Sequence, residues 1–600
     1  MREVDVLIIG GGPAGLSAAI ECGRSNVDTV IVDDGLKLGG QLIKQTHKFF
    51  GSAEQFAGKR GIDIARDLIN TVKSLDSITL IDRSTVLALY DDGIAVYEKD
   101  GAHHKVKAKK IIVATGAKEK MLLFENSDLP GVYGAGAVQT LMNVYGVKPG
   151  ERALMVGAGN VGLIVAYQLL QAGVNVVGIV EASDHVGGYK VHADKIKRMG
   201  IPIYLKHTIA KVDGPGYVEK AIVAEIDKNW KPVVGTEKIF DVDLVCIAVG
   251  LSPLIEILGE SEVDIRYIPE LGGYVPIHDE NMKTSNDNIY VAGDASSIEE
   301  ATSAILEGRI AAINVLKSLG KSYDDKILGG AKKELEQLRA GPVGVKIRSG
   351  LSKMYDKKWA KSEKDSYKEA EYDKFEDKKV AVIECFTQIP CNPCEANCPT
   401  GAIKIGKDIN MIPKIDLSKC IGCEQCVLSC PGLAIRLIHK NFDENYSLIS
   451  LPYELLPLPQ KGDRVALTND RGKIIGYGEV HSVLNAMKKN KTNIVRVKVL
   501  KNIANMVKYI YSNKTKSDII VCRCEQVSLK EIEDAIDEGY TEIEELKRYL
   551  RLGMGPCGGK NCIEIAMRIL QQKTGKRADS IPTKRPPVRP IPFSIFLNKD

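Results

Sequence analysis

The chain has 600 residues, which at about 100 to 200 residues per domain predicts several domains. Its 44% hydrophobic and 26% charged residues are typical of globular proteins, and they exclude wholesale disorder and an integral membrane protein. With 82 basic and 77 acidic residues the net charge is only +5, and no basic run is long enough to predict a nucleic-acid partner.

Neither a membrane span nor a secretory signal is expected. The longest apolar stretch, residues 153–180, is interrupted by glycine, asparagine and glutamine. The N-terminus leads directly into a short apolar segment and a glycine turn, without a cleavage site. These features favour a cytoplasmic protein.

Residues 1 to about 320 alternate strand-like and helix-like segments between glycine turns, which predicts a parallel α/β architecture. The strand Val4–Ile9 leads into Gly10-Gly-Gly-Pro-Ala-Gly15 and a helix, and a second strand ends in Asp33. The three glycines allow a tight turn, close approach of a pyrophosphate and close helix packing, and the acid accepts ribose hydroxyls. The residues expected in this dinucleotide site are Gly10, Gly12, Pro13, Ala14, Gly15 and Asp33.

The same unit recurs at residues 153–181, where Gly157-Ala-Gly-Asn-Val-Gly162 follows a strand and the next strand ends in Glu181. Two such folds in one chain predict a flavin in one and a nicotinamide in the other. Glu181 would repel a 2′-phosphate and no arginine follows closely, so NAD is favoured over NADP. The alternative is a fold that binds no nicotinamide or another adenine nucleotide. The residues expected here are Gly157, Gly159, Asn160, Gly162 and Glu181.

Further segments follow in the order found in two-dinucleotide-binding flavoprotein reductases, the superfamily of thioredoxin reductase and other pyridine nucleotide-disulfide oxidoreductases. They are Leu38-Gly-Gly-Gln-Leu42 and the ranges 111–116, 245–250 and 289–294. The chain resembles this superfamily over about residues 1–320, which implies two Rossmann-like domains with FAD and NAD(H). The resemblance also implies that Asp294 binds the ribityl chain of FAD and that a helix starting at Glu300 faces the flavin. The other FAD residues that it implies are Gly40, Gln41, Thr115, Gly116, Gly250, Gly293 and Thr302.

One departure from the superfamily concerns its redox cysteine pair. The two stretches where disulfide reductases carry that pair, residues 39–47 and 133–138, contain no cysteine here, so disulfide reduction is not expected. Cys22 and Cys246 fall in a predicted helix and strand, where we expect small buried hydrophobes. Lys44 and His47 are either neighbours of the flavin or ordinary loop residues. No catalytic acid or base is assigned, because no such constellation is apparent.

The other twelve of the 14 cysteines form two blocks. Between the nucleotide folds and the first block lies a segment rich in Lys, Glu, Asp and Tyr, for which we expect a solvated helical connector or, alternatively, a disordered linker. The run Cys420-x2-Cys423-x2-Cys426-x3-Cys430-Pro has the spacing of bacterial ferredoxins, and residues 391–398 form a partial second copy. The usual crossing of ligands predicts two [4Fe-4S] clusters, one on Cys398, Cys420, Cys423 and Cys426 and the other on Cys385, Cys391, Cys394 and Cys430. The wide gap after Cys385 leaves that ligand open, and zinc is the alternative metal.

β-branched segments around the turn Asn469–Gly472 predict a small β module after this block. The second block has the spacing Cys522-x-Cys524 and Cys557-x4-Cys562, with glycines around the second pair. It resembles the [2Fe-2S] domain of bacterioferritin-associated ferredoxin, which implies one [2Fe-2S] cluster on these four cysteines, with zinc as the alternative. The chain ends in a Pro-rich tail that is expected to be extended.

The order of the parts, with the segments 521–525, 551–557 and 585–590, resembles the alpha subunits of heteromeric amino-acid, imino-acid and opine dehydrogenases. This implies an FAD-dependent oxidoreductase that passes electrons between FAD and iron-sulfur clusters, and whose partner is a second flavoprotein dehydrogenase subunit. One alternative is a self-sufficient NADH-dependent reductase that uses a soluble carrier such as ferredoxin, and another is a scaffold with structural clusters. The expected domains are FAD-binding over 1–150 and 240–325, NAD-binding over 151–239, the connector over 326–379, ferredoxin-like over 380–440, the β module over 441–518, the mainly helical [2Fe-2S] domain over 519–575 and the tail over 576–600.

Overall fold

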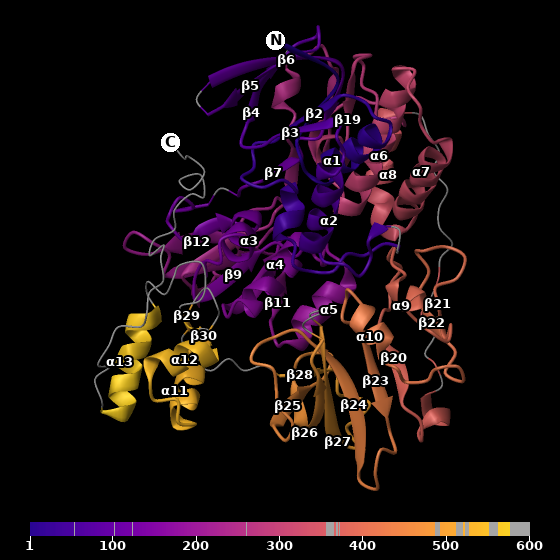
Figure 1. Cartoon of the computed structure of the whole chain (residues 1–600). Coiled ribbons are helices and arrows are strands. Elements are labelled where there is room, and N and C mark those ends of the chain that lie inside the picture. The colour runs from indigo at the N-terminus through magenta and orange to yellow at the C-terminus, as the bar shows by residue number, and fades with distance from the viewer. Residues whose placement is uncertain are drawn as a thin grey trace. The chain divides into compact units, whose positions relative to one another are not determined.

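Figure 1 shows the computed structural model of the chain. It describes residues 1–600 except 53–54, 101, 123, 260, 356–364, 366, 368–369, 371, 487–491, 512–519, 523–526, 551, 553–561 and 576–600. The chain forms two compact units, residues 1–144 with 149–511 and residues 145–148 with 512–600. Within the described ranges, no helix is long and apolar enough to cross a membrane.

The first nucleotide fold is built on a seven-stranded sheet of order β3-β2-β1-β6-β5-β4, with β19 beside β6. Its central strand β1 pairs in parallel with β2 and β6. Strand β2 and the C-terminal halves of β1 and β6 are apolar and buried, as expected where helices cover a parallel sheet. The strands are β1 (Arg2–Ile9), β2 (Thr29–Val32), β3 (Ile78–Ile81), β4 (Thr85–Leu89), β5 (Ile94–Lys99), β6 (Ala102–Val113) and β19 (Ile289–Val291). Short two-stranded ribbons join β7 (Ala117–Glu119) to β16 (Leu251–Pro253) and β17 (Ile265–Ile268) to β18 (Gly273–Pro276).

Helices α1 and α6 lie side by side on this sheet, and their contact is close because Gly308 packs on the Ala14 backbone. A Cβ at position 308 would lie 2.1 Å from the Ala14 carbonyl oxygen. Helix α7 lies in the expected helical connector. It contributes Ala331 and Leu335 to the same core, so one face of this helix is buried and not solvated. The helices are α1 (Pro13–Arg24), α2 (Gly61–Lys73), α6 (Ala301–Ser318), α7 (Asp325–Ala340) and α8 (Val345–Met354).

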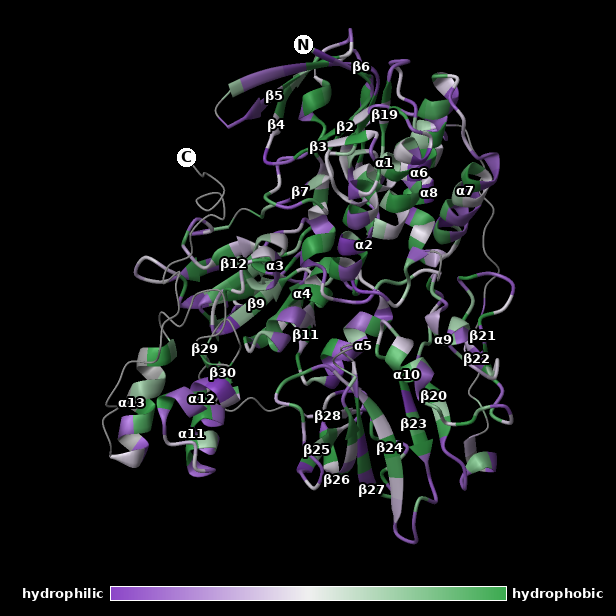
Figure 2. Ribbon diagram, in the orientation of Figure 1, coloured by the Kyte–Doolittle hydropathy of each residue, from purple (hydrophilic) through white to green (hydrophobic). Residues whose placement is uncertain are grey.

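The second nucleotide fold has a five-stranded parallel sheet of order β11-β10-β9-β15-β8. Strands β8 and β15 lie outside the expected range of 151–239, but β15 pairs with both β9 and β8, so this fold begins earlier and ends later than expected. Figure 2 shows hydrophobic residues concentrated along α4 and the adjacent strand β9. The elements are β8 (Val132–Gly134), α3 (Ala135–Asn143), β9 (Arg152–Val156), α4 (Asn160–Gln171), β10 (Asn175–Glu181), α5 (Lys190–Arg198), β11 (Ile203–Leu205), β15 (Leu244–Ile247), and a separate antiparallel sheet of β12 (His207–Asp213), β13 (Lys220–Glu225) and β14 (Lys238–Asp241).

The ferredoxin-like segment and the β module are not separate domains. They share one seven-stranded antiparallel sheet of order β20-β23-β24-β27-β26-β25-β28, because β23 and β24 form a hairpin across the expected boundary at residue 440. The expected hairpin of β25 and β26 is present. The elements are β20 (Val380–Ile383), α9 (Pro393–Ala396), β21 (Ile403–Lys404), β22 (Lys414–Ile415), α10 (Gln425–Ser429), β23 (Ile435–His439), β24 (Tyr446–Tyr453), β25 (Arg464–Thr468), β26 (Ile474–Leu484), β27 (Asn493–Leu500) and β28 (Tyr509–Ile510).

This sheet packs against the second nucleotide fold. Leu163 of α4 and Ile196 of α5 share one apolar core with Leu451 of β24 and Val495 of β27. A polar contact accompanies this shared core: Thr468 Oγ1 donates a hydrogen bond of 3.1 Å to the Arg198 carbonyl oxygen. The two parts therefore bury their apolar faces on each other.

The second unit is small and mainly helical, as expected for the region around the last cysteine block. Its own core contains Ile532, Leu546 and Ala566 together with Cys522 and Cys562. Cys524, Cys557 and the Pro-rich tail lie outside the described residues. The elements are β29 (Ile520–Cys522), β30 (Val527–Ser528), α11 (Leu529–Asp537), α12 (Ile543–Leu550) and α13 (Cys562–Thr574).

Candidate functional site

The first glycine loop connects β1 to α1 and leaves room for a ligand at one position. A Cβ at Gly10, where φ is +105°, would lie 2.3 Å from the Ala114 carbonyl oxygen, and one at Gly15 would lie 1.8 Å from the Gly10 carbonyl oxygen. At Gly12 the nearest atom is 3.9 Å away. Glycine is therefore required by the fold at the first and third positions. At the second position the open space fits the close approach of a pyrophosphate.

The second glycine loop has the same geometry. A Cβ at Gly157 would lie 2.3 Å from the Ala248 carbonyl oxygen, and one at Gly162 would lie 2.1 Å from the Gly157 carbonyl oxygen. At Gly159 no atom lies within 4 Å. Both loops thus leave open space at the second glycine, which is the cradle that a dinucleotide would fill.

The terminal acids of the two folds bind the backbone of their own loops. Asp33 accepts hydrogen bonds from the backbone N–H groups of Gly11 (2.6 Å) and Gly35 (2.9 Å). Glu181 accepts them from Ala158 (2.7 Å) and Ser183 (2.9 Å). Burial raises the pKa of Asp33, although the two N–H groups lower it. Each carboxylate is therefore held at its glycine loop, where it could also accept ribose hydroxyls.

Both loops open into one cavity of about 1870 Å³. Lys44 and His47 also line it, and burial lowers the pKa of His47 to about 3. Gly15 and Gly162 do not line it, since they serve the packing of helix on loop. The expected cofactor residues that line it are Gly10, Gly12, Pro13, Ala14, Asp33, Gly40, Gln41, Thr115, Gly116, Gly157, Gly159, Asn160, Glu181, Gly250, Gly293, Asp294 and Thr302.

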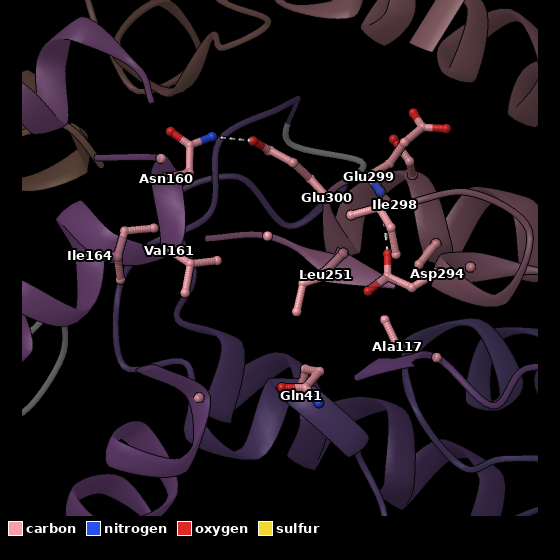
Figure 3. A pocket seen from close by; sticks show the side chains of 18 of the residues that line it. Gln41, Ala117, Asn160, Val161, Ile164, Leu251, Asp294, Ile298, Glu299 and Glu300 are labelled. Carbon is pink, nitrogen blue, oxygen red and sulfur yellow. Dashed lines mark hydrogen bonds between the residues drawn. The ribbon is translucent and has the colours of Figure 1, made fainter. Parts of the chain in front are cut away.

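Three acidic residues that line this cavity, Asp294, Glu299 and Glu300, lie just before α6, and the Glu300 side chain points toward Asn160 (Figure 3). Asp294 accepts a hydrogen bond of 3.3 Å from the backbone N–H of Glu299, and burial raises the pKa of Asp294 to about 7. The amide of Asn160, from the second glycine loop, donates 3.2 Å to Glu300, which precedes the first residue of α6. Burial raises the pKa of Glu300. The two nucleotide folds therefore contact each other directly at Asn160 and Glu300.

A buried arginine holds the segment that carries Asp294 and Glu300. Arg339 of α7 is 4% exposed and forms ion pairs with Glu299 (2.5 Å) and with Glu307 of α6. Glu307 also accepts hydrogen bonds from the Gly293 backbone (2.9 Å) and the Ser296 hydroxyl (2.8 Å). This network explains why α7 packs on the flavoprotein fold.

Four cysteines gather behind the wall of the large cavity, beside Gly51, which lines it. Burial raises the pKa of Cys391, and so does the negative charge of the neighbouring thiols Cys394, Cys430 and Cys385. Gly51, which lines the cavity, accepts a hydrogen bond of 3.1 Å from the Asn392 backbone and forms a β-bridge with Cys391. The structure therefore brings Cys385 into this group despite the wide gap in the sequence.

The second group of four lies apart from the large cavity. Cys398, Cys420, Cys423 and Cys426 line one small pocket, and Cys423 is exposed. The assignment of these two sets of cysteines to two separate clusters stays a prediction. Across the described ranges, no three His, Cys, Asp or Glu side chains converge closely enough to hold one metal ion.

Several buried cations lie near Cys430, and no motif in the sequence indicates them. Lys48 donates to the Thr492 hydroxyl (2.6 Å) and to the Leu428 carbonyl, and burial lowers its pKa to about 8. Burial also lowers the pKa of Lys195 to about 8. Their positive charge faces the thiol of Cys430.

The isolated cysteines are buried as expected. Cys22 in α1 and Cys246 in β15 are both inaccessible, and burial raises the pKa of Cys22 to about 12. Neither reaches the cavity. Phe50 and Gly51, in contrast, lie at its wall beside Cys391, and no local pattern in the sequence marks them.

The comparison with protein families decides the classification. Residues 4–308, about half of the chain, match the family described as pyridine nucleotide-disulphide oxidoreductase. The chain belongs to the pyridine nucleotide-disulphide oxidoreductase family. It also matches a 4Fe-4S dicluster domain over residues 389–434 and a BFD-like [2Fe-2S] binding domain over residues 520–572.

Proteins with similar sequences include subunits of sarcosine and opine oxidases. The alpha subunit of sarcosine oxidase from Rhizobium meliloti (strain 1021) is 33% identical over 197 residues, which cover 30% of this chain and 19% of that one. An opine oxidase subunit from Agrobacterium tumefaciens (strain Ach5) is 24% identical over 52% of this chain and 66% of that one. The chain spans no more than about a third of the sarcosine oxidase alpha subunits that it matches.

Among solved structures, L-proline dehydrogenase from P. horikoshii aligns with a TM-score of 0.44 and 19% identity over 99% of this chain and 79% of that one. The predicted fold class, with two reductase-type nucleotide folds and iron-sulfur domains, is confirmed. The family membership identifies the chain as an FAD-dependent oxidoreductase.

Proposed function

We propose that this chain is the electron-transfer subunit of a heteromeric amino-acid or imino-acid dehydrogenase. It would pass electrons between FAD, an NAD(H) site and iron-sulfur clusters. When bound, FAD supplies the conversion between hydride and single electrons, and iron-sulfur clusters carry single electrons. Its similarity to subunits of sarcosine oxidase and opine oxidase supports a partner subunit that oxidises the amine.

The observation that carries the proposal is the continuity of one cavity between three candidate sites. Its wall includes Gly12 of the first loop, Gly159 of the second and Gly51 beside Cys391. Gly12 and Gly159 leave open space that could take two dinucleotides, and the carboxylates of Asp33 and Glu181 are held at these loops, where each would accept ribose hydroxyls. Electron transfer needs short separations between centres, and this shared cavity supports them.

The residues of the chain have separable tasks in this function. Asp294 and Thr302 would position the FAD, Glu181 would orient the ribose of NAD(H), and the N-terminus of α6 would favour negative charge at the flavin. Cys385, Cys391, Cys394 and Cys430 would hold the [4Fe-4S] cluster nearer the cavity, and Cys398, Cys420, Cys423 and Cys426 the other. Cys522, Cys524, Cys557 and Cys562 would hold the [2Fe-2S] cluster.

The test is anaerobic isolation with identification of the chains that co-purify. We expect about one FAD per chain, iron without stoichiometric zinc, and loss of flavin absorbance only when both an amine substrate and the partner subunit have been added. The variant Cys391→Ser should lose iron and keep its flavin, whereas Cys22→Ser, a buried thiol outside both groups, should keep both. A colourless protein, or one with zinc in place of iron, would contradict the proposal.

A self-sufficient NADH-dependent reductase is the second candidate. The contact between Asn160 and Glu300 favours it, because it brings the second glycine loop to the edge of the flavin site. Rapid loss of flavin absorbance on adding NADH to the isolated chain, with ferredoxin as acceptor, would favour this candidate over the first.

A further inference from the structure

One end of the large cavity is left unexplained by the proposed electron transfer. It lies next to the segment that follows Glu181, where the Lys206 backbone N–H, just before β12, donates to the Ser183 carbonyl oxygen (3.0 Å). Its wall there includes His207 at the start of β12 and Ile226 and Trp230 from the turn between β13 and β14. In a dinucleotide fold the pyrophosphate lies at the glycine loop and the ribose at the terminal acid, so the base lies beyond that acid. This end of the cavity is therefore the place for an adenine base.

Trp230 is the unusual residue of this wall. Its side chain is 69% exposed, although tryptophan is normally highly buried. Within the part of the chain that the structure describes, no ring or cation packs on its indole. Its φ of +63° is rare for a bulky residue. The fold thus presents a large apolar ring at a cavity wall without a partner of its own.

The turn that carries Trp230 is fixed by its own hydrogen bonds. Asp227 Oδ1 accepts from the backbone N–H groups of Asn229 (2.8 Å) and Lys231 (2.9 Å), and the Trp230 backbone N–H donates to the Asp227 carbonyl oxygen (3.1 Å). A β-bridge between Ile226 and Pro232 closes the turn. A turn whose backbone is already ordered loses little conformational freedom when a flat ligand stacks on the side chain that it carries.

The neighbouring wall is also fixed. Nε2 of His207 lies 2.9 Å from Lys238 Nζ, and Nδ1 of His207 lies 2.7 Å from the Leu205 carbonyl oxygen. Both ring nitrogens therefore have partners within the protein. A base at this end would meet a preformed wall with one free aromatic face, that of Trp230.

We propose that Trp230 is the base-stacking residue of the second nucleotide site and that its ligand is an adenine nucleotide. The inference rests on the proposed function only in that the second fold binds a nucleotide. It holds for NAD(H) and for an adenosine phosphate, which share the base. Stacking of a base on an aromatic side chain contributes enough that its removal should weaken binding about tenfold.

The chain offers a direct optical test, because its two tryptophans are Trp230 and Trp359. In the full-length variant Trp359→Phe, tryptophan emission comes from Trp230 alone. We expect NAD⁺, ATP and AMP to quench that emission, and nicotinamide mononucleotide, which lacks adenine, to leave it unchanged. By calorimetry, Trp230→Ala should raise the Kd of each adenine nucleotide about tenfold, and Trp230→Phe should raise it much less.

The outcomes separate this inference from the proposed function. If adenine nucleotides bind Trp230→Ala as tightly as the wild type, or leave the emission of Trp359→Phe unchanged, the inference is wrong even where NADH reduces the flavin. If ATP and NAD⁺ both quench but NADH never reduces the flavin, the stacking role stands and the nicotinamide part of the proposed function falls. Quenching by nicotinamide mononucleotide would also overturn the inference.

Discussion

Replacing Arg339 by methionine tests the buried network that holds the Asp294 segment. Methionine keeps much of the side-chain volume but removes the charge that compensates Glu299 and Glu307, whose side chains are only 8% and 2% exposed. Removing one partner of a buried ion pair costs about 3–5 kcal/mol of unfolding free energy. We expect a loss of this size for the flavoprotein fold at about pH 8.

The loss of unfolding free energy in Arg339→Met should be smaller at acid pH, because Glu307 can then be protonated. Burial raises the pKa of Glu307 to about 7 even though Arg339 lowers it, so removing Arg339 raises that pKa further. A carboxyl with a raised folded-state pKa binds its proton more tightly in the folded state, and stability then falls as the pH rises above the unfolded pKa. The variant should therefore be closer to the wild type at about pH 5 than at about pH 8.

Urea unfolding followed by release of flavin fluorescence measures this effect on the fold concerned. With an m-value of about 2–3 kcal/mol/M, the midpoint should fall by about 1–2 M at the higher pH. Lys333→Met, at an exposed position of the same helix, is the matched control and should change stability by less than about 0.5 kcal/mol. The double variant Arg339→Met with Glu307→Gln should recover part of the loss. Equal midpoints for Arg339→Met and Lys333→Met, or an equal loss at both pH values, would refute the reasoning.

Three further predictions concern single residues. Gly159→Ala places a methyl group in open space, so the thermal unfolding midpoint should stay the same. The affinity for NAD⁺, measured by equilibrium dialysis, should fall about tenfold or more. An unchanged affinity would contradict the assignment of Gly159 to a nucleotide site. Cys385→Ser should remove about four iron atoms per chain in a colorimetric iron assay, and unchanged iron content would exclude Cys385 as a ligand. Glu424→Gln should cost about 1.5–3 kcal/mol, because Glu424 accepts two hydrogen bonds from Arg496. Burial raises the pKa of Glu424, but the hydrogen bonds from Arg496 and the other partners lower that pKa more. The wild type should therefore lose this stability as the pH falls below the ordinary pKa of 4.5, and the variant should not. Acid unfolding curves of the two proteins measure the difference.

The sequence predicted the nucleotide folds well because their determinants are local. The spacing of glycines after Ile9 and Val156, and an acid at the end of the next strand, specify a turn, a helix and a carboxylate within about 30 residues. The structure adds a detail that no spacing reveals. Asp33 and Glu181 bind the backbone of their own glycine loops, so each acid also supports the loop that would hold the pyrophosphate.

Contacts between distant segments could not be predicted in the same way. Gly51 reaches Cys391 across 340 positions of sequence, and Arg339 reaches back to Glu307 from a helix whose composition suggested exposure to solvent. The boundary at residue 440 was wrong because β23 and β24 form a hairpin across it. The turn residues Asn441, Asp443 and Asn445 lie in that connection, but turn residues alone do not show whether the flanking strands belong to one sheet. Such contacts depend on how complete elements pack, which periodicity and composition do not encode.

The core that joins α4 and α5 to the antiparallel sheet has a practical consequence for dissecting the enzyme. Trimming the chain after the flavoprotein half, or expressing the sheet alone, would expose part of the apolar core that the two parts share. Neither fragment should therefore be expected to keep the structure that it has in the intact protein. The nucleotide folds and the antiparallel sheet belong to one compact unit, and a fragment that contained only one of them would expose an apolar surface prone to aggregation.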